Sequence, residues 1–124
     1  MRNIASFEDA CNVLQLNFKK MTFDFLTFPE KHRKALEARI KLTIIAEALN
    51  DGWQPDWGDD DECKYEPWFI MGGSSGSSFS YGGCSLSISC VAGGSGLFYK
   101  TRELGEYAGK QFKDLYHDYL FVKK

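Results

Sequence analysis

Acidic and aromatic side chains gather between residues 51 and 69, in the stretch DGWQPDWGDDDECKYEPWF. Its nineteen positions hold seven carboxylates and five aromatic rings. Clustered carboxylate oxygens are the ligands that Ca²⁺ and Mg²⁺ prefer, whereas aromatic walls with an acidic rim suit the docking of a protein. The candidate binding residues of this stretch are Trp53, Trp57, Asp59, Asp60, Asp61, Tyr65 and Trp68.

The spacing of these acids does not match a known metal loop. An EF-hand alternates its ligands and has a glycine at the sixth position, whereas residues 59–62 are four consecutive acids. The cysteines contain no CxxC pair and lie at no zinc-finger spacing from a histidine. We therefore expect no metal and no cofactor, and we expect the four cysteines to be free, buried thiols. They are Cys11, Cys63, Cys84 and Cys90.

Residues for nucleophilic catalysis are scarce in this sequence. A serine or cysteine nucleophile needs a general base, and the only histidines, His32 and His117, stand among charged residues that predict solvent-facing positions. The segment GGSSGSS (72–78) lacks the lysine and the following helix of a phosphate-binding loop. The sequence therefore favours a non-enzymatic protein, with a small metal-dependent enzyme as the least favoured alternative.

Three helices are expected to position these residues. Ser6 can cap a short helix that begins at Phe7, and Pro29 and Gly52 bracket a long helix with a wide apolar face. Thr101 can cap a last helix over residues 102–121, in which Gly105 and Gly109 form a flat strip for close packing. Between the first two helices, residues 17–28 predict an irregular, largely buried aromatic connector.

Strands are expected between the second and third helices, over residues 64–71, 77–81, 84–90 and 96–100. Cys84, Leu86, Ile88 and Cys90 alternate with serines, which predicts one buried strand face. Turns are expected at residues 72–78 and 93–96. The order indicates one α+β domain over residues 1–124, with N-terminal helices, a three- to four-stranded antiparallel sheet and a C-terminal helix on one face of the sheet.

Charge is distributed unevenly along the chain. Residues 51–66 carry a net charge of −6 from seven acids and Lys64, whereas residues 67–96 carry no charged side chain. A sheet edge without charged residues tends to pair with another strand. The sequence therefore predicts binding to another protein or a homo-oligomer formed through a sheet edge.

DNA binding is a second hypothesis, since the expected helices carry many basic residues, although the isoelectric point near 5.7 disfavours it. These residues are Lys31, Arg33, Lys34, Arg39, Lys41, Lys100, Arg102, Lys110 and Lys113. No apolar run reaches the roughly 18 residues of a membrane span, and no signal-peptide pattern opens the chain. We therefore expect a cytoplasmic protein without a membrane partner.

Five segments, in order, carry a resemblance to a known family: SFEDACNVL, PEKHRKAL, AEALNDGWQPDW, KYEPWF and KTRELGEYAGKQFKDLYHDYL. In these the chain resembles an uncharacterised family of small proteins from gut anaerobic bacteria, their prophages and mobile elements. The resemblance implies a phage or mobile-element accessory protein and implies no particular chemistry.

Two interpretations of the 51–69 stretch remain open. In the first, its aromatic residues seal the corner between the central helix and the sheet while the acids form a solvated tip. In the second, they form an aromatic-walled, acid-rimmed binding surface. The corner interpretation is the favoured one, because the helix ends at this point and Gly52 and Pro55 allow and stiffen a turn.

Overall fold

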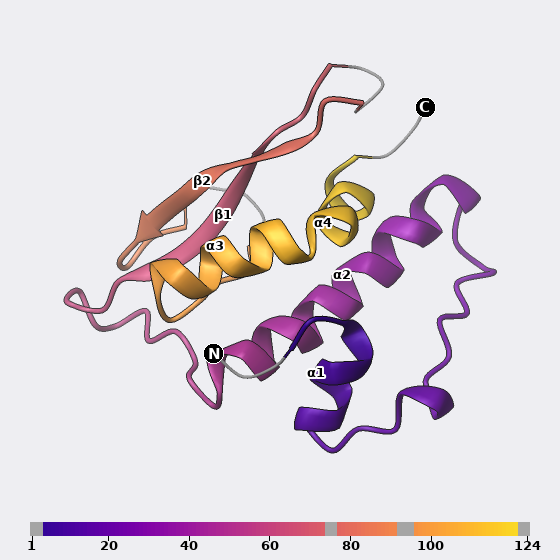
Figure 1. Ribbon diagram of the computed structural model, residues 1–124, viewed down its shortest axis with the longest axis horizontal. Helices are drawn as coiled ribbons and strands as arrows, with labels where there is room; N and C mark the ends of the chain where they lie inside the picture. Colours follow the sequence, from indigo (N-terminus) through magenta and orange to yellow (C-terminus); the bar gives the residue numbers. More distant parts are fainter. Residues whose placement is uncertain (1–3, 74–76, 92–95, 122–124) are drawn as a thin grey trace.

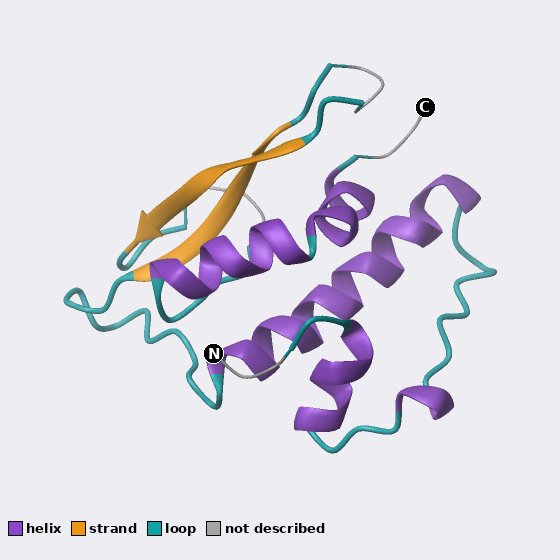
Figure 2. Cartoon of the chain, in the orientation of Figure 1, coloured by secondary structure: helices purple, strands orange, loops and turns teal. Residues whose placement is uncertain are grey.

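The computed structural model describes residues 4–73, 77–91 and 96–121 of the chain (Figure 1). Along the sequence it contains α1 (Phe7–Val13), a 3₁₀ turn η1 (Phe18–Lys20), α2 (Glu30–Asn50), β1 (Lys64–Ile70), β2 (Ser80–Ser87), α3 (Arg102–Gln111) and α4 (Lys113–Leu120). Among the described residues the fold is therefore α+β, with four α-helices and a two-stranded antiparallel sheet. The helices lie on one side of the β1–β2 hairpin (Figure 2).

Helix α1 begins, and helix α2 begins and ends, close to where the sequence predicts. Ser6 caps α1, because its Oγ accepts the backbone N–H of Asp9 at 3.1 Å. Helix α2 follows Pro29 and ends where Asp51 and Gly52 take left-handed φ values of 50° and 89°. This reversal turns the chain from α2 into the acidic stretch.

The apolar face of α2 is narrower than predicted. Of the wide apolar face that the sequence predicts, the part formed by Ala38, Leu42, Ile45 and Leu49 is buried, whereas Ile40 is 40% exposed. No helix in the described part of the chain is long and apolar enough to cross a membrane.

The prediction of three to four strands is not confirmed within the described residues. Two expected strands, 77–81 and 84–90, merge into the single strand β2. The expected strand at 96–100 makes one isolated bridge, in which Tyr65 and Tyr99 exchange both backbone hydrogen bonds at 3.1 and 2.7 Å. Two residues along β1, Pro67 has no N–H to offer on that edge, so the next pair can form at most one of its two hydrogen bonds. The expected turns include residues 74–76 and 92–95, which lie outside the described part.

The prediction that one face of residues 84–90 is buried is wrong. Cys84 is half-buried, but Leu86 and Ile88 are 48% and 40% exposed and Cys90 is exposed. The reason is the position of α3, whose first residue, Arg102, accepts a hydrogen bond from the Cys84 thiol through its carbonyl at 3.8 Å. Residues of β2 beyond Cys84 therefore extend past the start of the helix that would cover them.

The glycine strip of α3 packs on the sheet, as the sequence predicts. A Cβ on Gly105 would lie 2.9 Å from Cys84 Sγ, and a Cβ on Gly109 would lie 2.6 Å from the ring of Tyr81 and 3.0 Å from Pro67. The distances of 2.9 and 2.6 Å are shorter than those that real Cβ atoms show, and the distance of 3.0 Å is at that limit. Glycine therefore lets the α3 backbone approach both strands.

The predicted single C-terminal helix is bent into α3 and α4 at Phe112. This residue has φ −108° and ψ 29°, and its buried side chain packs near Tyr107, with the ring centroids 6.4 Å apart. The bend lets α3 pack on the hairpin while α4 lies beside α2 (Figure 1). In the core the hydroxyls of Tyr99 and of Tyr116, a residue of α4, share a hydrogen bond of 2.9 Å, and burial raises the pKa of both hydroxyls.

The connector between α1 and α2 is irregular, as predicted, but it is not largely buried. Leu26 and Phe28 are 72% and 50% exposed. Phe23 makes the main inward contact of the connector, with its ring 6.1 Å from that of Phe7 and 5.2 Å from Lys41 Nζ. Arg33 holds the end of the connector by donating to the carbonyls of Leu26 and Phe28 at 3.1 and 2.9 Å.

Candidate functional site

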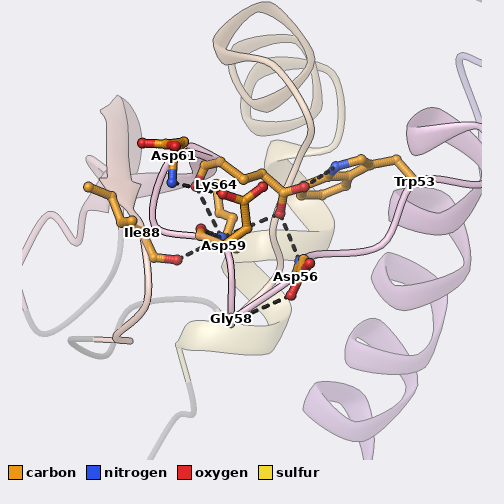
Figure 3. Close-up of polar contacts among 8 residues, drawn as sticks. Trp53, Asp56, Gly58, Asp59, Asp61, Lys64 and Ile88 are labelled. Atoms are coloured by element: carbon orange, nitrogen blue, oxygen red, sulfur yellow. Dashed lines mark hydrogen bonds and ion pairs between the residues drawn. The ribbon is translucent and has the colours of Figure 1, made fainter.

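The acidic stretch is organised around the buried ammonium group of Lys64 (Figure 3). The side chain is fully buried, and its Nζ donates to the carbonyls of Asp59, Glu62 and Ile88 at 3.3, 3.0 and 2.6 Å. A buried ammonium needs such partners because it has lost its hydration. Lys64 therefore fastens the acidic loop, and the chain after β2, to the start of β1.

Glu62 closes the same loop through its carboxylate. Its Oε1 accepts the backbone N–H of Asp56 at 2.7 Å and lies 3.3 Å from Lys64 Nζ, while its Oε2 accepts the indole N–H of Trp53 at 3.2 Å (Figure 3). These contacts lower the pKa of Glu62, the backbone hydrogen bond from Asp56 first and then those from Trp53 and Lys64. The carboxylate serves the loop itself.

The aspartates of the loop do not converge on a common point. Asp56 and Asp59 accept backbone N–H groups two residues ahead, from Gly58 at 3.0 Å and Asp61 at 2.9 Å, and so form local turns. Asp60 and Asp61 are exposed. No group of three or more His, Cys, Asp or Glu side chains within the described residues is arranged to hold a metal ion.

A cleft of about 710 Å³ separates the acidic loop from the start of α3. Three predicted binding residues line it, namely Trp53, Asp61 and Tyr65. The opposite wall carries Lys100 and Arg102, together with Glu103. Charges of both signs therefore meet in this cleft, and its lining favours neither an anion nor a cation.

Trp57 belongs to the corner between the loop and the sheet. Its ring packs edge-to-face on Phe98 with centroids 5.0 Å apart and lies 5.2 Å from Lys64 Nζ. The side chain is still 38% exposed. Trp57 therefore shields the buried ammonium on one side and meets solvent on the other.

Trp68 lies apart from the acidic loop, farther along β1. Residues of a strand alternate between its faces, and Tyr65, Pro67 and Phe69 contact α3 or α4. The positions between them therefore form the opposite face of the hairpin, which we call the outer face. On β1 the outer face consists of Lys64, Glu66, Trp68 and Ile70.

The outer face has a covered half and an open half. At the covered half Lys64 and Glu66 are 0% and 5% exposed, and Glu66 accepts the N–H of Gly96 at 3.0 Å. At the open half Trp68 and Ile70 are 46% and 54% exposed. The Trp68 indole rests on the backbone of Gly82 and Gly83, where a side chain on Gly82 would overlap the ring.

The outer edge of β2 is occupied at one point by a charged side chain. Since Tyr65 directs its backbone groups toward Tyr99, its β2 neighbour Leu86 and the next alternate residue, Cys84, direct theirs away from β1. Arg102 of α3 donates to the Cys84 carbonyl at 3.3 Å. A charged residue on an edge strand hinders pairing with another strand, and the sequence prediction of an unprotected edge missed this one because it comes from a distant helix.

The structure thus separates the predicted binding residues into four groups. Trp53, Asp61 and Tyr65 line the cleft, Trp57 and Asp59 belong to the corner around Lys64, and Trp68 lies on the open half of the outer face; Asp60 is exposed at the loop tip.

Two organising residues were missed by sequence reasoning. Lys64 could have been found as the lone cation among seven acids. Asn50, at the end of α2, donates to the carbonyl of Phe98 at 2.9 Å and accepts the N–H of Lys100 at 3.0 Å, and thereby binds the extended segment before α3. Its pattern in the sequence is that of an ordinary helix end, so no signal marked it.

The basic residues considered for DNA binding are mostly engaged within the chain. Arg33, Arg102 and Arg39 donate to Phe28 and Leu26, to Cys84 and to the Tyr119 hydroxyl, respectively. Lys34, Lys41 and Lys110 pair with Asp118, Glu37 and Glu106. Six of the nine therefore have internal partners, which leaves fewer for phosphate groups.

The thiols and imidazoles differ in part from their predictions. All four cysteines are free, but only Cys11 is buried, whereas Cys63 and Cys90 are exposed and Cys84 is half-buried. Burial, and to a smaller extent Glu8, raises the pKa of Cys11. His32 is exposed as expected, while His117 is partly buried between Phe79 and Phe121, at ring distances of 5.1 and 5.3 Å.

Comparison with known proteins gives no relative. No protein-family model, no curated protein sequence and no solved structure matches the chain. The function is therefore argued from the arrangement of its own residues.

Proposed function

We propose that this protein is a non-enzymatic binding protein and that the open half of its outer face docks another protein. The observation that carries the proposal is the exposure of Trp68 and Ile70, 46% and 54%, at consecutive outward positions of β1. An antiparallel sheet with one face in water normally presents polar side chains on that face. Tryptophan is also among the residues that contribute most to protein interfaces.

The surroundings of these two residues support the same proposal. No charged side chain occurs between Pro67 and Gly96, so partner binding at this region would desolvate no ion. Met71, which follows Ile70 in the chain, is 37% exposed. Exposed apolar surface of this kind marks interaction sites on small proteins.

The acidic corner supports the proposal less well. Lys64, Glu62, Asp56 and Asp59 satisfy one another and the loop backbone. Their polar groups are engaged in holding the loop closed, whereas the corner interpretation had expected the acids to form a solvated tip. The resemblance to small proteins of phages and mobile elements supports an accessory role in such an element as the biological setting.

Photo-crosslinking tests the proposed docking face. A photoreactive amino acid replaces Ile70 in the full chain, and the matched control replaces Asp60, which is also exposed but lies on the acidic loop. In cells that produce the protein, illumination is expected to give protein adducts from position 70 and few from position 60. Adducts from position 60 alone, or from neither position, would overturn the proposal.

A further inference from the structure

We infer that the cleft between the acidic loop and the start of α3 binds a short peptide that carries both an ammonium group and a carboxylate. This site goes beyond the proposed function, because its lining shares no residue with the open half of the outer face. The inference rests on the size of the cleft, on its fixed walls and on the arrangement of its charges.

The walls of the cleft are held in place by hydrogen bonds within the chain. On the loop side the indole N–H of Trp53 donates to the Glu62 carboxylate at 3.2 Å. On the other side the backbone N–H of Lys100 donates to the side chain of Asn50 at 3.0 Å. The cleft volume of about 710 Å³ lies within the range of about 300 to 1,000 Å³ that is typical of small-molecule sites. A cleft with fixed walls loses little side-chain entropy when it takes up a ligand.

Three charged side chains of the cleft form no ion pair within the described part of the chain. They are Asp61 on the loop side, and Lys100 and Glu103 on the α3 side. The guanidinium of Arg102, in contrast, donates to the Cys84 carbonyl. Opposite charges therefore line one cleft without neutralising each other.

A ligand with only one kind of charge fits this lining poorly. An anion near Lys100 would also approach the like charges of Asp61 and Glu103, whereas a cation would approach Lys100 and Arg102. Such like-charge contacts exclude ligands of the wrong kind. A zwitterion can place its carboxylate near Lys100 and its ammonium group near Asp61 or Glu103, so the charges of the cleft favour a ligand that carries both.

Two aromatic rings, those of Trp53 and Tyr65, complete the lining. Both side chains are half-buried, so part of each remains open to a ligand. Aromatic rings offer a large apolar contact area. We therefore expect the apolar middle of the peptide to lie against these rings while its charged groups meet the charged side chains.

Protection of Cys63 from alkylation tests the inference. Cys63 is an exposed thiol that lines the cleft, and Cys90, an exposed thiol outside the lining, is the internal control. The probe is the tripeptide Gly-Phe-Gly, whose free ends make it a zwitterion near pH 7. Capping the amino end, the carboxyl end or both gives an anion, a cation and a neutral peptide of the same sequence. Mass spectrometry measures the rate at which iodoacetamide alkylates each thiol in the purified full chain.

The free tripeptide is expected to slow alkylation of Cys63 and to leave Cys90 unchanged. Its half-protecting concentration should lie about threefold or more below that of each capped form, because each end contributes an ion pair. Lys100→Met should raise this concentration at least to the value for the peptide with a capped carboxyl end. The double variant Asp61→Asn, Glu103→Gln should raise it at least to the value for the peptide with a capped amino end.

Three results would overturn the inference: no protection by the free tripeptide, equal protection by the neutral form, or equal slowing at Cys90. An unchanged half-protecting concentration in either variant would do the same. The substituted side chains are exposed and form no ion pair within the described residues, so both variants should fold, which circular dichroism confirms. Crosslinking from position 70 tests the docking face separately, so the failure of one proposal leaves the other in place.

Discussion

Both halves of the outer face of β1 reverse the usual relation between polarity and burial. Lys64 and Glu66, which are charged, are 0% and 5% exposed, whereas Trp68 and Ile70, which are apolar, are 46% and 54% exposed. These four side chains occupy every second position of β1 and therefore lie on the same side of the sheet. The difference between the halves therefore comes from what lies over each half, since the strand is common to both.

The covered half is enclosed by two segments, one that precedes the hairpin in the sequence and one that follows it. The acidic loop supplies the Asp59 and Glu62 carbonyls, and the chain after β2 supplies the Ile88 carbonyl and the N–H of Gly96. With these partners, burial of charge is tolerable. At the open half the described residues provide no comparable cover. We propose that a partner protein covers the apolar side chains there.

The largest effect is expected from removing the buried ammonium. Lys64→Met keeps the length of the side chain but leaves three carbonyls and the Glu62 carboxylate without their shared donor. Breaking a buried ion pair from one side costs about 3 to 5 kcal/mol of unfolding free energy. Urea denaturation measures the loss.

The matched control for this variant is Lys110→Met. Lys110 also pairs with a glutamate, Glu106, but both side chains are about half exposed, at 59% and 47%. Removal of an exposed pair should change stability by no more than about 1 kcal/mol. Equal losses from the two variants would show that the covered half is not organised by Lys64.

The next effect in size compares two tryptophans, one from the loop that covers Lys64 and one from the open half. Trp57→Ala removes the ring that packs on Phe98 and covers Lys64, and because the ring is partly exposed it should cost about 2 kcal/mol, less than the 3 to 5 of a buried tryptophan. Trp68→Ala, in dilute protein, should cost about 1 kcal/mol, since the ring rests on Gly82 and Gly83 and is 46% exposed. Thermal unfolding at low protein concentration measures both. The reverse order would contradict the division of the face.

A pH dependence is expected from Glu62. Because its pKa is lower in the folded protein, the carboxylate adds stability above the unfolded-state pKa, about 4.3, and this contribution is lost as pH falls through the folded pKa. Glu62→Gln should therefore be less stable than the wild type near neutral pH and should approach it in acid. Urea denaturation between pH 7 and pH 3 measures the difference, and a gap that stays constant would exclude Glu62 as the source.

The smallest effect on the stability of the dilute protein is expected at Ile70. Ile70→Ser changes a side chain that is more than half exposed, so the unfolding free energy should change by no more than about 0.5 kcal/mol. The same variant should weaken binding of the partner at the open half, because it removes apolar contact area. A large loss of stability in dilute solution would mean that Ile70 is covered within its own chain.

The helices could be predicted from the sequence because local signals mark their ends. Ser6, Thr101 and the Asp51–Gly52 turn fix three of these ends, and the glycine pair of α3 predicts close packing on the sheet. The number of strands could not be predicted as well. Serine and glycine fit both strand and loop, and the end of the pairing at Tyr99 depends on where Pro67 lies in the register.

The candidate site was harder to predict than the fold. Tyr65 and Trp68 are three residues apart on one strand, so alternation alone places them on opposite faces. The partners of Lys64 include Ile88, twenty-four residues away, and the cover over Cys84 comes from Arg102. Contacts between segments far apart in the sequence determine which aromatic residues are buried. The composition of the chain does not reveal these contacts.

Hydroxyl-radical footprinting of the tryptophans tests the central claim most directly. The measurement is the oxidation rate of Trp68 relative to Trp57, in dilute purified protein and inside cells that produce the protein. We predict that Trp68 reacts readily in dilute protein and is protected in cells, while Trp57 reacts equally in both. Equal oxidation of Trp68 under the two conditions would contradict the assignment of the open half as a docking face.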